Sequence, residues 1–131
     1  MTDLATLYFS FWSTAIPFGN SHLPVFLEQL VPVGQSLPYL TYTLSRNEAF
    51  ENGLDVVRVW TRSTSVAPLM ALLDHVEVAM PHGGRTLTLP NGKGAIRLFR
   101  GQPFIQRQPM PDGEADIQVG YVNIETRSWM L

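Results

Sequence analysis

The feature that most constrains the fold is an alternation of apolar and polar residues that recurs along the chain and is broken by proline and glycine. In the segment LPYLTYTLS (37–45), Leu40, Tyr42 and Leu44 fall on one side of an extended strand, and a tyrosine and two threonines fall on the other. Aromatic and β-branched residues at period two suit a pleated surface. The segment therefore predicts a β-strand that begins at Pro38, because proline cannot donate to a ladder and belongs at a strand start or an outer edge.

A second alternating segment, residues 54–62, is expected to pair with the first as an antiparallel hairpin. Val57 and Val59 fall on one face of this segment, and Arg58 and Trp60 fall on the other. The polar residues between the two segments end in an Asn-Gly pair, which favours a turn. The two segments together predict the start of a sheet with one apolar face.

The same alternation predicts further strands, separated by Pro-Asn-Gly and Pro-Asp-Gly turn sequences. These strands are expected over residues 85–89, 95–100, 103–108 and 116–127. Gly101 is expected to break the chain between the second and the third of them. The connector 16–36 is rich in proline but too apolar for a disordered linker, and we expect a short strand within residues 25–28.

Two other segments show helical spacing. Residues 3–15 carry apolar and aromatic side chains three or four positions apart, and Pro17 and Gly19 follow them. Residues 66–80 carry an apolar stripe at the same spacing, which predicts an amphipathic helix. The stripe consists of Val66, Leu69, Leu73, Val76 and Met80. We therefore expect one domain over residues 1–131 with an α+β fold, in which an antiparallel sheet of about four strands is packed on one face by one or two helices.

Composition narrows the function classes. Cysteine is absent, which excludes disulfides, thiol chemistry and cysteine-ligated metals and fits a reducing compartment. The net charge of −2 gives no global attraction to nucleic acid or anionic lipid. No apolar run approaches the ~18 residues that a membrane span needs. No Lys or Arg precedes Arg46, so the basic start of a signal peptide is missing, and the sequence is typical of a soluble, intracellular domain.

Common enzyme and metal motifs are not matched. The three histidines, His22, His75 and His82, do not form the i, i+4 pair of a zinc protease. The segment GGRTLTLPNGKG lacks the glycine spacing of a phosphate-binding loop and the Ser or Thr that should follow Lys93. There is no Gly-X-Ser-X-Gly motif, and the acidic residues at 112–116 do not complete a calcium loop. We therefore predict no enzyme activity, no metal site and no cofactor.

Charge is low and unevenly distributed. Only 15% of the residues are charged, against a usual ~25%, and such a surface is more often partly covered by partners. No acidic residue lies between Glu77 and Asp112, whereas five basic residues do. They are Arg85, Lys93, Arg97, Arg100 and Arg107. An acidic group follows at once, consisting of Asp112, Glu114 and Asp116.

Three interpretations of this segregation stay open. It arises by chance on a solvated sheet face, or it forms a basic face that touches DNA phosphates. In the third, basic and acidic patches of different copies meet, since a head-to-tail ring contact requires two different patches. We predict that these charged residues contribute to a subunit or partner contact, together with the closing strand or a sheet edge near Tyr39.

Several segments in a fixed order carry a resemblance over most of the chain. They are FWSTAIPFG, FLEQLVPVG, LPYLTYTLS, VVRVWTRSTSVAPLMALLDHVEVAM, GAIRLFRGQPFIQRQPMPD and IQVGYVNIETRSWML. This ordered set resembles the bacteriophage and prophage tail-completion proteins, a tail-terminator-like family. The Pro-Tyr strand start in LPYLTYTLS is similar to the most recognisable motif of that family. The loops 46–53 and 83–94 are not motif regions, so the resemblance implies nothing about their roles.

The resemblance implies an α+β fold and a structural role. A subunit of this family forms a ring, commonly a hexamer, that completes the tail tube and joins it to the head connector. The implied partners are other copies of the chain, the tail tube protein and the head–tail connector, in the virion tail and, during assembly, in the bacterial host cytoplasm. It implies neither an enzyme activity nor a cofactor. The alternatives are a head-completion or neck adaptor protein and, in a different class, a small DNA-binding module; we expect no membrane partner and no specific nucleic-acid binding.

Overall fold

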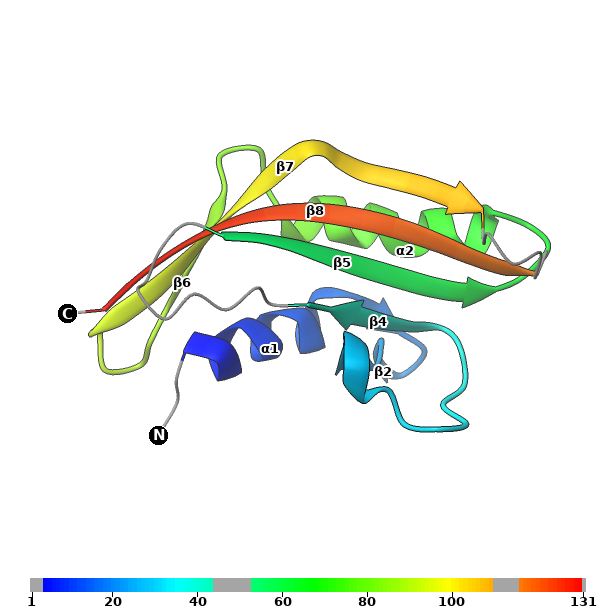
Figure 1. The fold of residues 1–131 in the computed structure, drawn as a ribbon, viewed down its shortest axis with the longest axis horizontal. Helices are drawn as coiled ribbons and strands as arrows, with labels where there is room; N and C mark the ends of the chain where they lie inside the picture. The colour runs from blue at the N-terminus through cyan, green and yellow to red at the C-terminus, as the bar shows by residue number, and fades with distance from the viewer. Residues whose placement is uncertain (1–3, 44–52, 110–115, 131) are drawn as a thin grey trace.

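The computed structural model of the chain describes residues 4–43, 53–109 and 116–130 (Figure 1). The N-terminal part contains α1 (Leu4–Ala15), β1 (Pro17–Phe18), β2 (Ser21–His22), β3 (Val25–Leu27), the 3-10 helix η1 (Glu28–Leu30) and β4 (Tyr39–Tyr42). The remainder contains β5 (Gly53–Arg62), α2 (Ala67–Ala79), β6 (Arg85–Thr88), β7 (Gly94–Pro109) and β8 (Ile117–Met130). Both predicted helices are confirmed, and the α+β class with them.

The main sheet of the described residues has six strands in the order β3-β4-β5-β8-β7-β6. The short strands β1 and β2 pair with each other as a separate hairpin. In the main sheet β3 runs parallel to β4, and the other neighbouring strands are antiparallel. The expectation of about four antiparallel strands is therefore wrong in both number and pairing. Residues 28–38 supply the crossover connection that a parallel pair requires, and this connection lets β3 join the sheet.

The predicted hairpin of β4 and β5 is confirmed. Tyr39 lies opposite Trp60 and Thr41 opposite Arg58, while Leu40 faces the core beside Val59. The strand β3 occupies the sheet edge beyond β4, so Tyr39 does not lie at an outer edge as expected. Pro38 precedes the first paired residue of β4, which agrees with a proline at a strand start.

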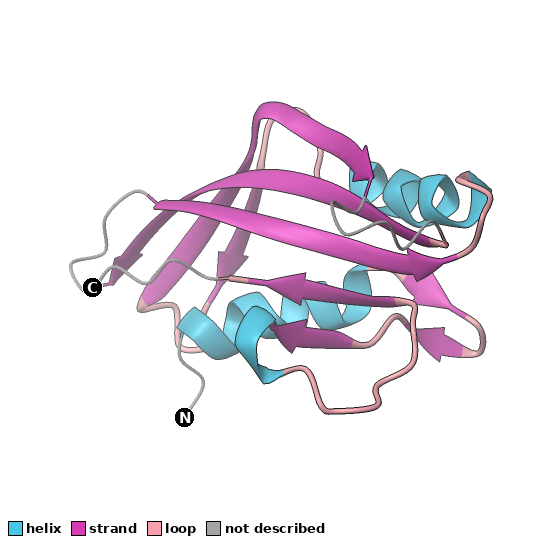
Figure 2. Ribbon diagram, turned by 45° about the vertical axis from the view of Figure 1, so that its right-hand side comes forward, coloured by secondary structure: helices cyan, strands magenta, loops and turns pink. Residues whose placement is uncertain are grey.

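The predicted break at Gly101 is wrong, because β7 continues through it as one bent strand (Figures 1 and 2). The pairing with β8 shifts register between Arg100 and Ile105. A Cβ atom on Gly101 would lie 2.8 Å from the carbonyl oxygen of Asn123, so the close approach of the two strands requires glycine here. The irregularity bends β7 and lets the two longest strands curl across the molecule.

The hydrophobic core lies between the sheet and the two helices α1 and α2, which pack on the same face. Tyr8 and Trp12 of α1 and Leu73 of α2 are buried against β-strand residues such as Val59. At Gly120 of β8 a Cβ atom would lie 2.9 Å from Leu73 Cδ1, so glycine lets α2 approach closely. The opposite face of the sheet is packed against no described helix, and we call it the uncovered face.

Candidate functional site

The uncovered face is formed by the alternate side chains of the strands that point away from α1 and α2. Residues of β5 that face the core, such as Val57 and Val59, are fully buried, and those between them point to the other side. The part of this face over β3, β4 and β5 differs from the part over β7 and β8. We call the first the paired half and the second the arginine half.

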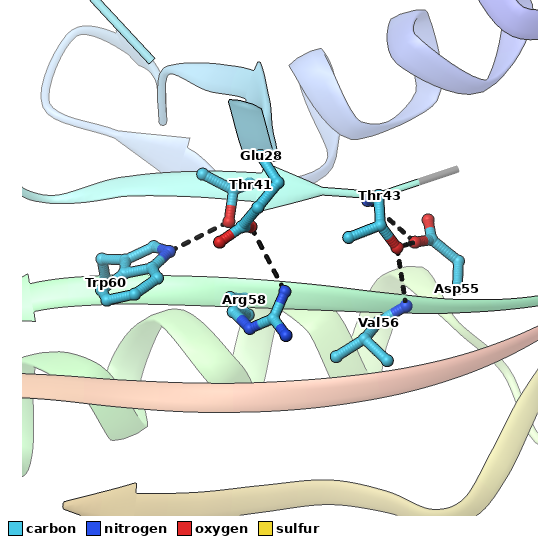
Figure 3. A network of polar contacts seen from close by, with 7 residues as sticks. All are labelled: Glu28, Thr41, Thr43, Asp55, Val56, Arg58 and Trp60. Carbon is cyan, nitrogen blue, oxygen red and sulfur yellow. Dashed lines mark hydrogen bonds and ion pairs between the residues drawn. The ribbon is translucent and has the colours of Figure 1, made fainter. Parts of the chain in front are cut away.

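The polar groups of the paired half bind each other (Figure 3). Arg58 Nη1, on β5, lies 3.3 Å from Glu28 Oε2, on η1 directly after β3. Trp60 Nε1 donates a hydrogen bond of 3.0 Å to Thr41 Oγ1 on the neighbouring strand. The guanidinium of Arg58 also lies 5.2 Å from the ring centroid of Tyr121, within the range of a cation–π contact.

Three aromatic side chains continue the paired half toward the β3 edge. The ring of Tyr39 lies 5.9 Å from that of Phe26 and 6.3 Å from that of Trp60. Burial, and to a lesser degree the Glu28 carboxylate, raises the pKa of Tyr39. Its phenol is therefore neutral near pH 7 and packs as an aromatic side chain. The sequence suggests an interface role for Tyr39, and the described contacts use it to join β3, β4 and β5.

Beneath the paired half a buried carboxylate anchors α1. Asp55 is only 2% exposed and accepts hydrogen bonds from the hydroxyl of Tyr8 and, at 2.9 Å, from the backbone N–H of Thr43. The Thr43 hydroxyl also donates to it (Figure 3). Burial raises the pKa of Tyr8 well above its usual value, and the charge of Asp55 adds to the effect. This network holds a proton on Tyr8 and fixes α1 against β4 and β5.

The arginine half holds two cations without an acidic partner. Arg97 of β7 lies directly opposite Arg127 of β8, and both guanidiniums stack on the ring of Phe99, at 5.1 and 5.3 Å from its centroid. Neither guanidinium forms an ion pair or a hydrogen bond with another described residue. Glu125, opposite Phe99, is exposed and pairs with neither of them. Trp129, two residues beyond Arg127, is 42% exposed.

This arrangement is suited to binding an anion. Like charges directly opposite each other in a sheet destabilise it, so the two guanidiniums gain when a negative group comes between or above them. Arginine presents a planar fork that matches a carboxylate or a phosphate. Stacking on Phe99 holds both guanidinium groups over one ring, so less side-chain entropy is lost when they bind an anion. The arginine half is therefore the candidate functional site.

The structure does not gather the predicted basic residues on one face. Arg97 belongs to the arginine half, but Arg100 lies on the helix side, where its Nε donates to the carbonyl of Met80 at 2.7 Å and its Nη2 to that of Glu77 at 3.0 Å. Arg85 likewise donates to the carbonyl of Ala79. Arg85 and Arg100 therefore bind carbonyls at the C-terminus of α2, which otherwise lack partners. An odd separation of three residues places Arg97 and Arg100 on opposite faces of β7.

The remaining predicted residues are spread over the molecule. Lys93 is exposed in the turn between β6 and β7, and Arg107 is exposed beyond the irregularity in β7. Asp116 forms an ion pair of 2.6 Å with Arg62. Asp112 and Glu114 lie outside the described residues. A subunit role for this set stays a prediction.

Three residues of the arginine half were not singled out by the sequence prediction, which named the closing strand only as a whole. They are Phe99, Arg127 and Trp129. Arg127 was left out of the predicted basic group because it follows the acidic residues 112–116 in the sequence. The period of two residues in a β-strand could have indicated these residues. It places Arg97 and Phe99 on one face of their strand, and Arg127 and Trp129 on one face of theirs. The register that brings the two pairs together could not be known from the sequence.

No helix within the described ranges has the length and apolar character to cross a membrane. Across the same described ranges, no three His, Asp or Glu side chains are grouped so that they could hold a metal ion. No protein-family model, curated protein or solved structure matches the chain.

Proposed function

We propose that this chain is a structural subunit of a phage or prophage tail, which forms a ring with its own copies, completes the tail tube and joins it to the head connector. It acts by docking and makes or breaks no covalent bond. The observation that carries the proposal is the uncovered face, where aromatic and arginine side chains lie on a sheet whose other face is packed on helices. The resemblance of the ordered segments to tail-completion proteins supports it.

The composition of this face favours a protein partner. Tryptophan, tyrosine and arginine are the residues enriched at protein interfaces and at their energetic hot spots. An antiparallel sheet face that only meets water usually alternates to polar side chains, whereas the uncovered face carries Trp60, Phe99, Tyr121 and the exposed Trp129. A net charge of −2 gives no general attraction to nucleic acid, and Glu28 already neutralises Arg58.

The proposal requires particular partners. A ring needs a heterologous contact, in which one patch of a copy meets a different patch of the next. A contact that persists in solution should bury more than ~1,000 Å². The other two partners are the tail tube protein and the head–tail connector, each of which binds one side of the ring.

Tail tubes polymerised from a tail tube protein of the same phage or prophage provide the test. We expect that the purified chain added to them forms caps at one tube end, visible by negative-stain electron microscopy, and stops elongation. Tubes that continue to grow and carry no cap would contradict the proposal. Binding to the head-side connector alone would indicate a neck adaptor. Salt-sensitive retention of duplex DNA on a filter would indicate the DNA-binding alternative.

A further inference from the structure

We infer that the arginine half of one copy docks against the outer face of α2 on a second copy. This inference rests on the proposed function, since it names the two surfaces that meet in the ring. It starts from the unmatched charges of the arginine half. Arg97 and Arg127 lie side by side and form no ion pair with a described residue, so both are available to an acidic surface on a second copy.

The outer face of α2 is acidic and apolar. Met70, Asp74 and Val78 are spaced four residues apart and Glu77 lies three residues after Asp74, so the four side chains share one side of the helix. Val78 is 82% exposed and Met70 is 45% exposed. Neither carboxylate forms an ion pair with another described residue, and Arg100 reaches Glu77 only through its backbone carbonyl.

The two faces match in spacing as well as in charge. Helix residues at i and i+3, such as Asp74 and Glu77, have Cβ atoms about 5–6 Å apart. Residues directly opposite in an antiparallel pair, such as Arg97 and Arg127, have Cβ atoms about 4.5–5.5 Å apart. Two carboxylates on the helix can therefore meet two guanidiniums on the sheet at the same time.

Apolar residues flank the charges on both faces. Met70 and Val78 lie about one helical turn, or ~6 Å, on either side of Asp74. On the sheet, Phe99 lies beneath the guanidiniums and Trp129 follows Arg127 by two residues, about 7 Å along the strand. Apolar contact around a charged centre adds the buried area that a charge pair alone does not supply.

The arginine half and the outer face of α2 cannot bind each other within one chain. The inner side of α2 packs on the sheet through Leu69, Leu73 and Val76. The outer side of the helix therefore points away from the sheet. The arginine half lies on the far face of the same sheet, because Arg97 alternates with the buried Ile96 and Leu98, and α2 lies behind β5 and β8 (Figure 1). Two different patches on opposite sides of the chain allow copies to associate head to tail. Such an assembly closes into a ring if the rotation between neighbouring copies closes.

A charge exchange tests this docking. The variant R97E/R127E carries acidic charge on both faces, and the variant D74K/E77K carries basic charge on both. We expect each variant alone to weaken self-association by at least about tenfold, because like charges are then juxtaposed. An equimolar mixture should recover assemblies in which the two variants alternate, measured by mass photometry and by native mass spectrometry, which separates their masses. The matched control, K93E/R107E, makes the same change in net charge at two exposed basic residues that form no part of the proposed charge pairs, and it should assemble as the unmodified chain does.

Cross-linking provides a second readout that does not depend on charge. The chain has no cysteine, so Val78→Cys and Thr86→Cys introduce single thiols, on the outer face of α2 and on the strand beside Arg97. A mixture of the two variants should give a cross-linked pair of different chains with a short bismaleimide. Thermal unfolding of each variant checks that it is folded.

Several results would overturn the inference. The first is that R97E/R127E assembles as the unmodified chain does, and the second is that the mixture of the two variants does not recover assembly. The third is that R97E/R127E loses assembly but D74K/E77K does not. The fourth is that the unmodified chain stays monomeric at every soluble concentration. None of them decides the proposed function. That function fails separately, if tail tubes with the unmodified chain remain uncapped.

Discussion

On one half of the uncovered face Arg58 lies 3.3 Å from Glu28, and on the other half Arg97 and Arg127 share one phenyl ring and form no ion pair with a described residue. The two halves belong to one sheet and have similar side chains, so composition does not separate them. The difference lies in whether each charge already has a partner. The paired half stabilises the fold, whereas the arginine half has binding capacity left for another molecule.

The largest expected effect is at the buried carboxylate that supports the paired half. Asp55→Ala leaves the Tyr8 hydroxyl and the Thr43 N–H without their acceptor. Each buried donor left without a partner costs about 1–3 kcal/mol, so we expect the free energy of unfolding to fall by about 3 kcal/mol. Urea unfolding measures it, with Asp55→Asn as the matched control, because its amide oxygen still accepts. A loss as small as that of the control would contradict a structural role for the Asp55 side chain as a hydrogen-bond acceptor.

A pH dependence follows from the same network. Because the pKa of Tyr8 is raised in the folded protein, folding binds its proton more tightly. This contribution is fully present below the ordinary phenol pKa of about 10 and is lost as the pH rises above it, by up to about 1.4 kcal/mol per pH unit. Urea unfolding between pH 9 and pH 11 measures the slope, and Tyr8→Phe should make it shallower. An unchanged slope in the variant would show that Tyr8 does not carry the effect.

The surface pair of the paired half should matter less. The side chains of Arg58 and Glu28 are 26% and 29% exposed, so solvent screens their attraction. We expect Arg58→Gln to lower the free energy of unfolding by no more than about 1 kcal/mol, and by less at high salt. Thermal unfolding at two salt concentrations tests this. A loss that does not change with salt would mean that packing on Tyr121 dominates.

The smallest effect on stability is expected in the arginine half. Arg97→Gln or Arg127→Gln removes a repulsion between charges directly opposite each other. The free energy of unfolding should change by less than about 1 kcal/mol, because the lost stacking on Phe99 offsets the relieved repulsion. Chemical unfolding of both variants measures it. A clear loss in either would show that these arginines stabilise the fold, and it would remove the distinction between the two halves.

The comparison also shows what the sequence could predict. Alternation in residues 54–62 correctly separates Val57 and Val59 from Arg58 and Trp60, since period two follows from local geometry alone. The stripe through Leu69 and Val76 predicts α2 for the same reason. These local patterns place the helices, the hairpin and the buried face.

Pairing between distant strands could not be predicted. The join of β3 to β4 depends on a crossover through the connector, and the meeting of Arg97 with Arg127 depends on a register set by the irregularity near Gly101. A one-residue slip would move every side chain of a strand to the other face. The grouping of basic residues by sequence position failed for this reason, because position along a strand does not fix the face.

Self-association of two neutralised variants tests the central claim most directly. Sedimentation velocity over a range of concentrations compares R97Q/R127Q with Arg58→Gln, against the unmodified chain. We predict that R97Q/R127Q loses its assemblies at unchanged thermal stability, and that Arg58→Gln keeps them even though it is slightly less stable. Equal loss of assembly in both variants, or in neither, would contradict the account that the arginine half is the surface left free for a partner.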